Sequence, residues 1–145
     1  MNQGTRIGLA VLAAVGVARL AGAADKDPAA AAAAQAELGG KLYAKHCASC
    51  HGDAGQGTAK APPVVGKDAL PKDPRPTQKV RKVPFRTAKD VADFVVVNMP
   101  GNKPGSLKAD EYFAILAFDL KANGVDLTGK PALTPDMLSS IVIHP

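Results

Sequence analysis

Residues 47–51 read Cys47-Ala48-Ser49-Cys50-His51, and the interpretation of the whole sequence starts from this stretch. The spacing C-x-x-C-H is typical of the attachment site of a c-type haem. Two thiols at this spacing lie on one turn of chain, where both can add to the vinyl groups of one porphyrin. The histidine that follows lies under the iron and can bind it through an imidazole nitrogen. The motif therefore predicts one covalently bound haem c, attached through Cys47 and Cys50 and ligated by His51.

Three other kinds of site fit these five residues less well. A structural zinc site takes about four ligands, usually from two such pairs, and the sequence contains only two cysteines. A redox-active C-x-x-C pair is expected in a βαβ context, and no strand–helix–strand pattern surrounds the motif. A disulfide within this short loop would leave His51 unexplained. A haem also suits the composition, because only 4% of the residues are aromatic and a buried haem would supply apolar bulk to a small core.

The length of 145 residues indicates a single domain behind an N-terminal leader. Arg6 precedes an apolar run over residues 7–18, and residues 21–23 (Ala-Gly-Ala) form a small-x-small cleavage pattern. The run is shorter than the roughly 20 residues that span a bilayer. Residues 1–23 are therefore predicted to be a signal peptide for export to the periplasm, and an uncleaved leader would tether the protein to a membrane. Residues 24–36 are alanine-rich and are expected to form a linker, at most partly helical.

An all-α domain is expected over residues 37–124, with three to five helices wrapped around the haem. One helix leads into the motif, because Leu38, Leu42 and Tyr43 share an apolar face with the first cysteine. A second helix begins at a capping box in residues 87–90 (Thr-Ala-Lys-Asp) and carries Phe94 in its apolar stripe.

The last long helix of the domain is expected over residues 107–122, with Ser106 as its N-cap and Gly124 as its stop. Residues 125–145 are expected to be a C-terminal extension that packs on the domain. This extension holds at most one short helix, starting at residue 134.

The second axial ligand of the iron is expected to be Met99. It lies at the end of the second helix, directly before a proline that stiffens the loop. A thioether favours reduced iron, and His/Met ligation raises the reduction potential. Met137 and His144 are the alternatives, whereas His46 directly precedes Cys47 and lies on the wrong side to reach the far face.

Two features of residues 52–89 concern the surroundings of the haem. The glycine-rich loop at residues 52–57 is expected to wrap the haem edge, and a carbonyl of the prolines that follow it would accept a hydrogen bond from the second ring nitrogen of His51. Residues 60–89 contain nine Lys and Arg against two Asp. This basic segment is either a solvated loop or a docking surface for an acidic redox partner.

Together these residues resemble the class I c-type cytochromes, which are small exported electron carriers with one haem. The resemblance covers residues 37–124. Gly39 and Tyr43 stand where that family has a glycine and an aromatic before the first cysteine. Residues 115–118 (Ile-Leu-Ala-Phe) look like the family's last helix, which implies that Phe118 crosses the first helix at Gly39.

The resemblance also assigns roles to individual residues. Residues 62–66 (Pro-Pro-Val-Val-Gly) look like the family's segment after the haem loop, which implies that Pro62 accepts the hydrogen bond from His51. Met99 with its proline looks like the family's axial methionine. Tyr43 and Phe94 are expected to pack against the haem or the core.

The predicted function is a one-electron shuttle in the periplasm, with redox proteins as partners. The protein is not expected to be an enzyme, to bind nucleic acid, or to be more than a monomer when free. Two alternatives remain. One is a permanent haem subunit of a larger dehydrogenase or oxidase, with the basic segment and the extension as interface. The other is a haem sensor or enzyme with a displaceable sixth ligand.

Overall fold

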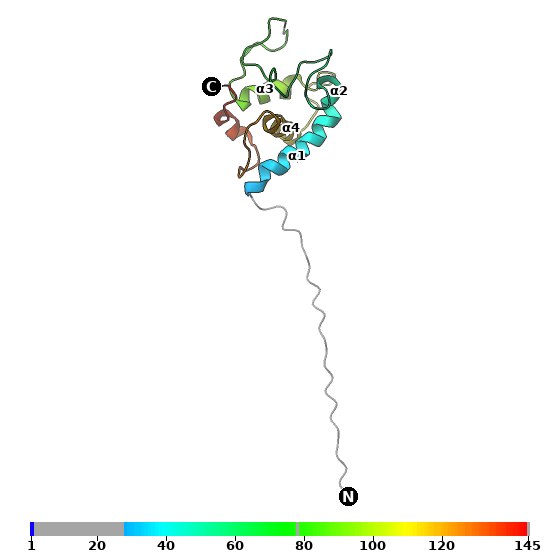
Figure 1. Ribbon diagram of the computed structural model, residues 1–145, viewed down its shortest axis with the longest axis vertical. Coiled ribbons are helices and arrows are strands. Elements are labelled where there is room, and N and C mark those ends of the chain that lie inside the picture. The colour runs from blue at the N-terminus through cyan, green and yellow to red at the C-terminus, as the bar shows by residue number, and fades with distance from the viewer. Residues whose placement is uncertain (2–27, 78, 145) are drawn as a thin grey trace.

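A computed structural model describes residue 1, residues 28–77 and residues 79–144 (Figure 1). These residues form four α-helices and one 3₁₀ helix, without a β-strand, which confirms the all-α prediction. The predicted signal peptide, residues 1–23, lies outside the described part apart from residue 1. No described helix is long and apolar enough to cross a membrane. The helices in chain order are α1 (Pro28–His46), α2 (Ala48–His51), α3 (Ala88–Asn98), α4 (Ala109–Ala122) and η1 (Pro135–Ser140).

The fold is centred on the crossing of α1 and α4, which make the most extensive contact between any two helices (Figure 1). A β-carbon at Gly39 would overlap the backbone carbonyl of Ala114, so only glycine lets the two helices approach this closely. The crossing differs from the expectation that Phe118 meets Gly39. Phe118 lies instead over Gly40, one residue further along α1, and its ring is 5.1 Å from that of Tyr43.

The expected linker over residues 24–36 is wrong from residue 28 onward, because α1 begins at Pro28. Ala32 and Ala36 are buried in the main core, and Gln35 between them exchanges two side-chain hydrogen bonds with the backbone of Leu133, at 2.7 and 3.1 Å. The alanines are therefore the small contact face of a helix. Sequence periodicity does not show this face, because alanine carries little hydrophobic signal.

Two details of the helices also differ from the predictions. The last helix begins at Ala109 rather than residue 107, and the expected cap Ser106 is not used, because the carboxylate of Glu111 accepts the backbone N–H of Lys108 at 2.8 Å. Leu38 is 52% exposed and does not join the apolar face of α1. The capping box of α3 is present, with Asp90 accepting the Thr87 N–H at 2.8 Å.

Residues 125–144 pack back on the helices. Leu127, Leu133 and Leu138 are all in the main buried cluster, together with residues of α1, α3 and α4. Near the end of the chain, a ring nitrogen of His144 lies 2.6 Å from the carbonyl oxygen of Leu70. The extension therefore completes the core and secures the long loop between α2 and α3.

Candidate functional site

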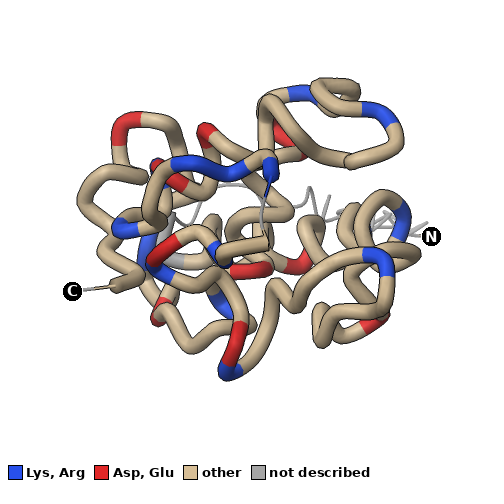
Figure 2. The backbone as a smooth tube through the Cα atoms, turned by 90° about the horizontal axis from the view of Figure 1, so that it is seen from above, with Lys and Arg blue, Asp and Glu red and all other residues tan. Residues whose placement is uncertain are grey.

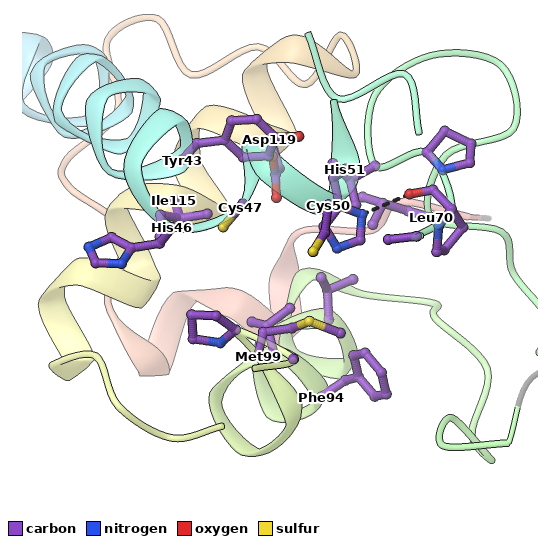
Figure 3. A pocket seen from close by; sticks show the side chains of 18 of the residues that line it. Tyr43, His46, Cys47, Cys50, His51, Leu70, Phe94, Met99, Ile115 and Asp119 are labelled. Carbon is purple, nitrogen blue, oxygen red and sulfur yellow. Dashed lines mark hydrogen bonds between the residues drawn. The ribbon is translucent and has the colours of Figure 1, made fainter. Parts of the chain in front are cut away.

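A cavity of about 430 Å³ lies among α1, α2, α3 and α4. Figure 3 shows Cys47, Cys50 and His51 on one side of it and Met99 and Phe94 on the other. We call the first side the proximal wall (Tyr43, Cys47, Cys50, His51 and Pro62) and the second the distal wall (Phe94, Met99 and Tyr112). The structure therefore brings every predicted site residue to one cavity.

The proximal wall orients His51 through its ring. The Nδ1 atom of His51 lies 2.7 Å from the carbonyl oxygen of Pro62. Since a carbonyl can only accept, Nδ1 carries the proton, and Nε2 is left with its lone pair for a metal ion. Burial raises the pKa of the neighbouring Cys47 thiol to about 12, so that as a free thiol it stays protonated near neutral pH.

Tyr43 secures the turn that follows the motif. Its side chain is 2% exposed, and its hydroxyl donates a hydrogen bond of 2.8 Å to the carbonyl of Gly52. Burial, followed by the nearby Asp119 carboxylate, raises the pKa of the phenol above its usual value. Tyr43 therefore remains a neutral hydrogen-bond donor that ties α1 to the residue directly after His51.

The distal wall holds Met99 through its backbone. Met99 follows the last residue of α3, and its carbonyl accepts a hydrogen bond of 2.6 Å from the hydroxyl of Tyr112 on α4 and one of 3.2 Å from the N–H of Gly105. Phe94, one turn earlier on α3, packs edge-on against Phe85 at 5.7 Å. Two elements distant from Met99 in the sequence thus fix the loop that presents its thioether to the cavity.

The alternative second ligands lie elsewhere or at the edge. Met137 and His144 are not among the residues that line the cavity, and His144 is engaged with the Leu70 carbonyl. His46 does line the cavity, but on the same helix that leads into the proximal wall (Figure 3). The arrangement therefore favours Met99 over the other three.

Three cations of the basic segment line the cavity: Lys60, Arg75 and Arg81. Arg81 is 4% exposed, lies 4.0 Å above the ring of Phe85, and donates hydrogen bonds to backbone carbonyls that include those of Lys72 and Val83. Burial lowers the pKa of its guanidinium. These cations could balance the two carboxylates that a haem carries, so part of the basic segment serves the cavity rather than the surface.

Two cavity residues were missed as site residues by the sequence analysis, Tyr112 and Asp119. Tyr112 looks like an ordinary member of an apolar stripe, and nothing local marks its bond to Met99. Asp119 did leave a signal, because it is an acid between Phe118 and Leu120 in an otherwise apolar helix face. Its side chain is 7% exposed, and no hydrogen-bond donor among the described residues reaches its Oδ1. Burial raises its pKa to about 8.

The residues of the cavity fit a covalently bound haem. The volume is in the range of pockets that enclose a small-molecule cofactor, the thiols and imidazole lie on one wall, and a soft thioether lies on the other. A protein-only metal site receives no support, since no group of three His, Cys, Asp or Glu side chains able to hold a metal ion occurs in residues 28–77 and 79–144.

Comparisons with known proteins agree with this fit. Residues 34–118 match the family described as cytochrome C oxidase, cbb3-type, subunit III. Among solved structures, the chain is similar to the sulfane dehydrogenase SoxCD from Paracoccus pantotrophus, with 33% identity and a TM-score of 0.56, over 74% of this chain and 52% of that one. It therefore spans about half the length of that relative.

A second solved structure is the thiosulfate dehydrogenase TsdBA from Marichromatium purpuratum in its "as isolated" form. It has 25% identity and a TM-score of 0.42, over 58% of this chain and 17% of that one. A comparison with curated proteins found no match.

Proposed function

Because the chain belongs to the cytochrome c family described as cbb3-type oxidase subunit III, and is a class I c-type cytochrome with covalently bound haem c, we propose that it carries single electrons between redox proteins. His51 and Met99 are the proposed axial ligands, and Cys47 and Cys50 the attachment points. The haem supplies the one-electron chemistry when bound. The protein's task is then to hold the iron ligands still and to exclude water.

One observation carries this proposal: His51 and Met99 face each other across the cavity, each held from outside (Figure 3). The Pro62 carbonyl holds the ring of His51, and Tyr112 holds the backbone of Met99. An iron with two protein ligands in both oxidation states needs little rearrangement between them, which suits electron transfer. An enzyme or sensor would need an open or easily displaced position.

The basic segment is the proposed docking surface for an acidic redox partner. Figure 2 shows Lys and Arg on several parts of the backbone with Asp and Glu between them, so what distinguishes residues 60–89 is their local excess of nine cations over two acids. Arg81 is buried and does not contribute to such a surface, whereas Lys79 and Lys82 are exposed. Docking of this kind speeds encounter and weakens with salt.

The second candidate function is a haem subunit within a larger oxidoreductase complex. The similarity to a chain of sulfane dehydrogenase SoxCD favours it, and the matched family is described as an oxidase subunit. Export to the periplasm is proposed for either function, on the basis of the signal-peptide pattern in residues 1–23. Purification from the native periplasm and membranes separates the two: a free carrier elutes at the size of one chain, and a subunit elutes with a partner.

The absorption spectrum tests the axial ligands of the holoprotein. We expect the oxidised form to show the weak far-red band of methionine-ligated haem, and the reduced form to bind carbon monoxide poorly. A holoprotein that lacks the band and binds carbon monoxide at once would refute the carrier function and favour a sensor or enzyme.

A further inference from the structure

We propose that Asp119 takes up a proton when the haem iron is reduced and releases it when the iron is oxidised, so that electron transfer by this protein is coupled to pH. The inference rests on the proposed electron-carrying function and adds a role for a residue that the axial ligands do not require. It starts from the position of one carboxyl group in the cavity wall.

Asp119 is placed where an apolar residue would be expected. Ala117 and Leu120, its neighbours on α4, are completely buried, and Asp119 itself is 7% exposed. Its Oδ1 has no hydrogen-bond donor among the described residues. A buried carboxyl group without a partner destabilises the fold when ionised, so its retention at this place calls for a function.

The carboxyl group lies on the haem side of α4. It lines the cavity together with both cysteines, and Figure 3 shows it close to Tyr43 and Cys47. The charge of Asp119 contributes to the raised pKa of both Tyr43 and Cys47. A haem attached through Cys47 would therefore lie within reach of the charge on Asp119.

Few charges around Asp119 compensate its own. From α1 it faces the neutral phenol of Tyr43 and the sulfur of Cys47, which carries no proton once attached to haem. The residues of α3 that line the cavity, Val91, Phe94 and Val95, are apolar. The remaining titratable or charged groups that line the cavity are His46, His51, Lys60, Arg75 and Arg81, and burial alone accounts for the shift of the Asp119 pKa.

The coupling follows from charge balance. Reduction adds one electron, delivered by a donor redox protein, and removes one positive charge from the iron. A buried carboxylate nearby then becomes harder to keep ionised, and Asp119 binds a proton from water, so that the local charge is unchanged. Oxidation by the acceptor protein reverses both transfers. Burial places the Asp119 pKa at about 8, within the range where such exchange occurs near neutral pH.

The sign of the effect is fixed by the same argument. An ionised carboxylate stabilises the oxidised iron and lowers the reduction potential, and a protonated one does not. The potential is therefore higher at acid pH, falls as the pH rises through the Asp119 titration, and levels off above it. A tenfold difference in proton affinity between the two oxidation states corresponds to about 59 mV between these limits.

The test is a redox titration of the holoprotein over two pH units on either side of about 8. We expect the wild type to show the fall, and Asp119→Asn to lose it while keeping its methionine–iron band. Asp110→Asn, which changes an exposed carboxylate on the same helix, should behave as wild type. The haem carboxylates also titrate, so a fall that persists unchanged in Asp119→Asn assigns the coupling to them and overturns the proposal.

An infrared difference spectrum between reduced and oxidised wild-type protein avoids reliance on the variant's folding. We expect the carbonyl band of a protonated carboxylic acid to appear on reduction. A wild-type potential that does not change with pH, with no such band, would refute the coupling even if the axial ligands are as proposed. Loss of the methionine–iron band in wild type would instead refute the carrier function.

Discussion

The two walls of the haem cavity hold their ligands in different ways. The proximal wall is one continuous stretch of chain, residues 43–62, and fixes the ring of His51 directly through the Pro62 carbonyl. The distal wall combines the end of α3, a loop and α4, and it fixes Met99 only through its backbone carbonyl. A thioether is also a weaker hydrogen-bonding group than an imidazole. The distal side is therefore the one on which ligand exchange should begin.

The largest expected effect comes from removing the covalent attachment on the proximal wall. Cys47→Ala combined with Cys50→Ala should abolish covalent haem completely, because no other cysteine exists in the chain. Mass spectrometry of the denatured chain measures this as loss of the haem mass. Met99→Ala is the matched change on the distal wall and should retain that mass. Covalent haem in the double variant would contradict the assignment of the motif.

The next effect concerns the crossing that joins the two walls. Gly39→Ala puts a β-carbon against the Ala114 carbonyl, and overpacking of this kind should lower the free energy of unfolding by about 3 kcal/mol. Since α1 leads into the proximal wall and α4 carries Tyr112, both walls should lose order together. Urea unfolding measures the change, with Gly101→Ala as the control, because a β-carbon there meets nothing within 4 Å. Equal stability of the two variants would argue against the tight crossing.

Replacing the distal ligand should leave the proximal wall intact. Met99→Ala should lower the reduction potential by an amount on the order of 0.1 V, within the roughly 0.8 V range that axial ligands span, and should admit carbon monoxide to the reduced iron. Redox titration and carbon monoxide binding measure the two effects. Met137→Ala serves as the control and should change neither. If Met99→Ala keeps the wild-type spectrum and potential, another residue ligates the iron.

The smallest effects compare the two tyrosines that support the walls. Tyr43→Phe and Tyr112→Phe each remove one hydroxyl that donates to a backbone carbonyl, and each should cost about 1 kcal/mol of folding stability. Only Tyr112→Phe should also speed carbon monoxide binding, because only that hydroxyl holds the Met99 loop. Stopped-flow measurements on the reduced variants check this. Equal acceleration in both variants would remove the distinction between the walls.

The walls also differ in how far the sequence predicted them. The attachment motif was predicted from spacing alone, and Met99 from its place at a helix end before a proline. The hydrogen bond from His51 to Pro62 was expected from the neighbouring prolines and from the resemblance. These features are local, so the order of residues along the chain carries most of the information.

What the sequence did not reveal depends on contacts between distant segments. Tyr112 reaches Met99 only because α4 packs against α3, and Asp119 reaches the cavity only through the crossing of α1 and α4. The alanines of α1 were mistaken for a linker, since their role is to let residues 125–144 come close. Ser106 was a reasonable cap by type, but Glu111 supplies the hydrogen bond that starts α4.

The pair of hydrogen bonds between Gln35 and Leu133 bears on how this domain can be transplanted. The side-chain amide of Gln35 offers a donor and an acceptor to one residue's backbone, as a neighbouring peptide group would. A chimera limited to residues 37–124, or to the matched residues 34–118, would omit one or both halves of this pair. The unit that can be grafted into a fusion protein with its core intact is therefore the whole of residues 28–144.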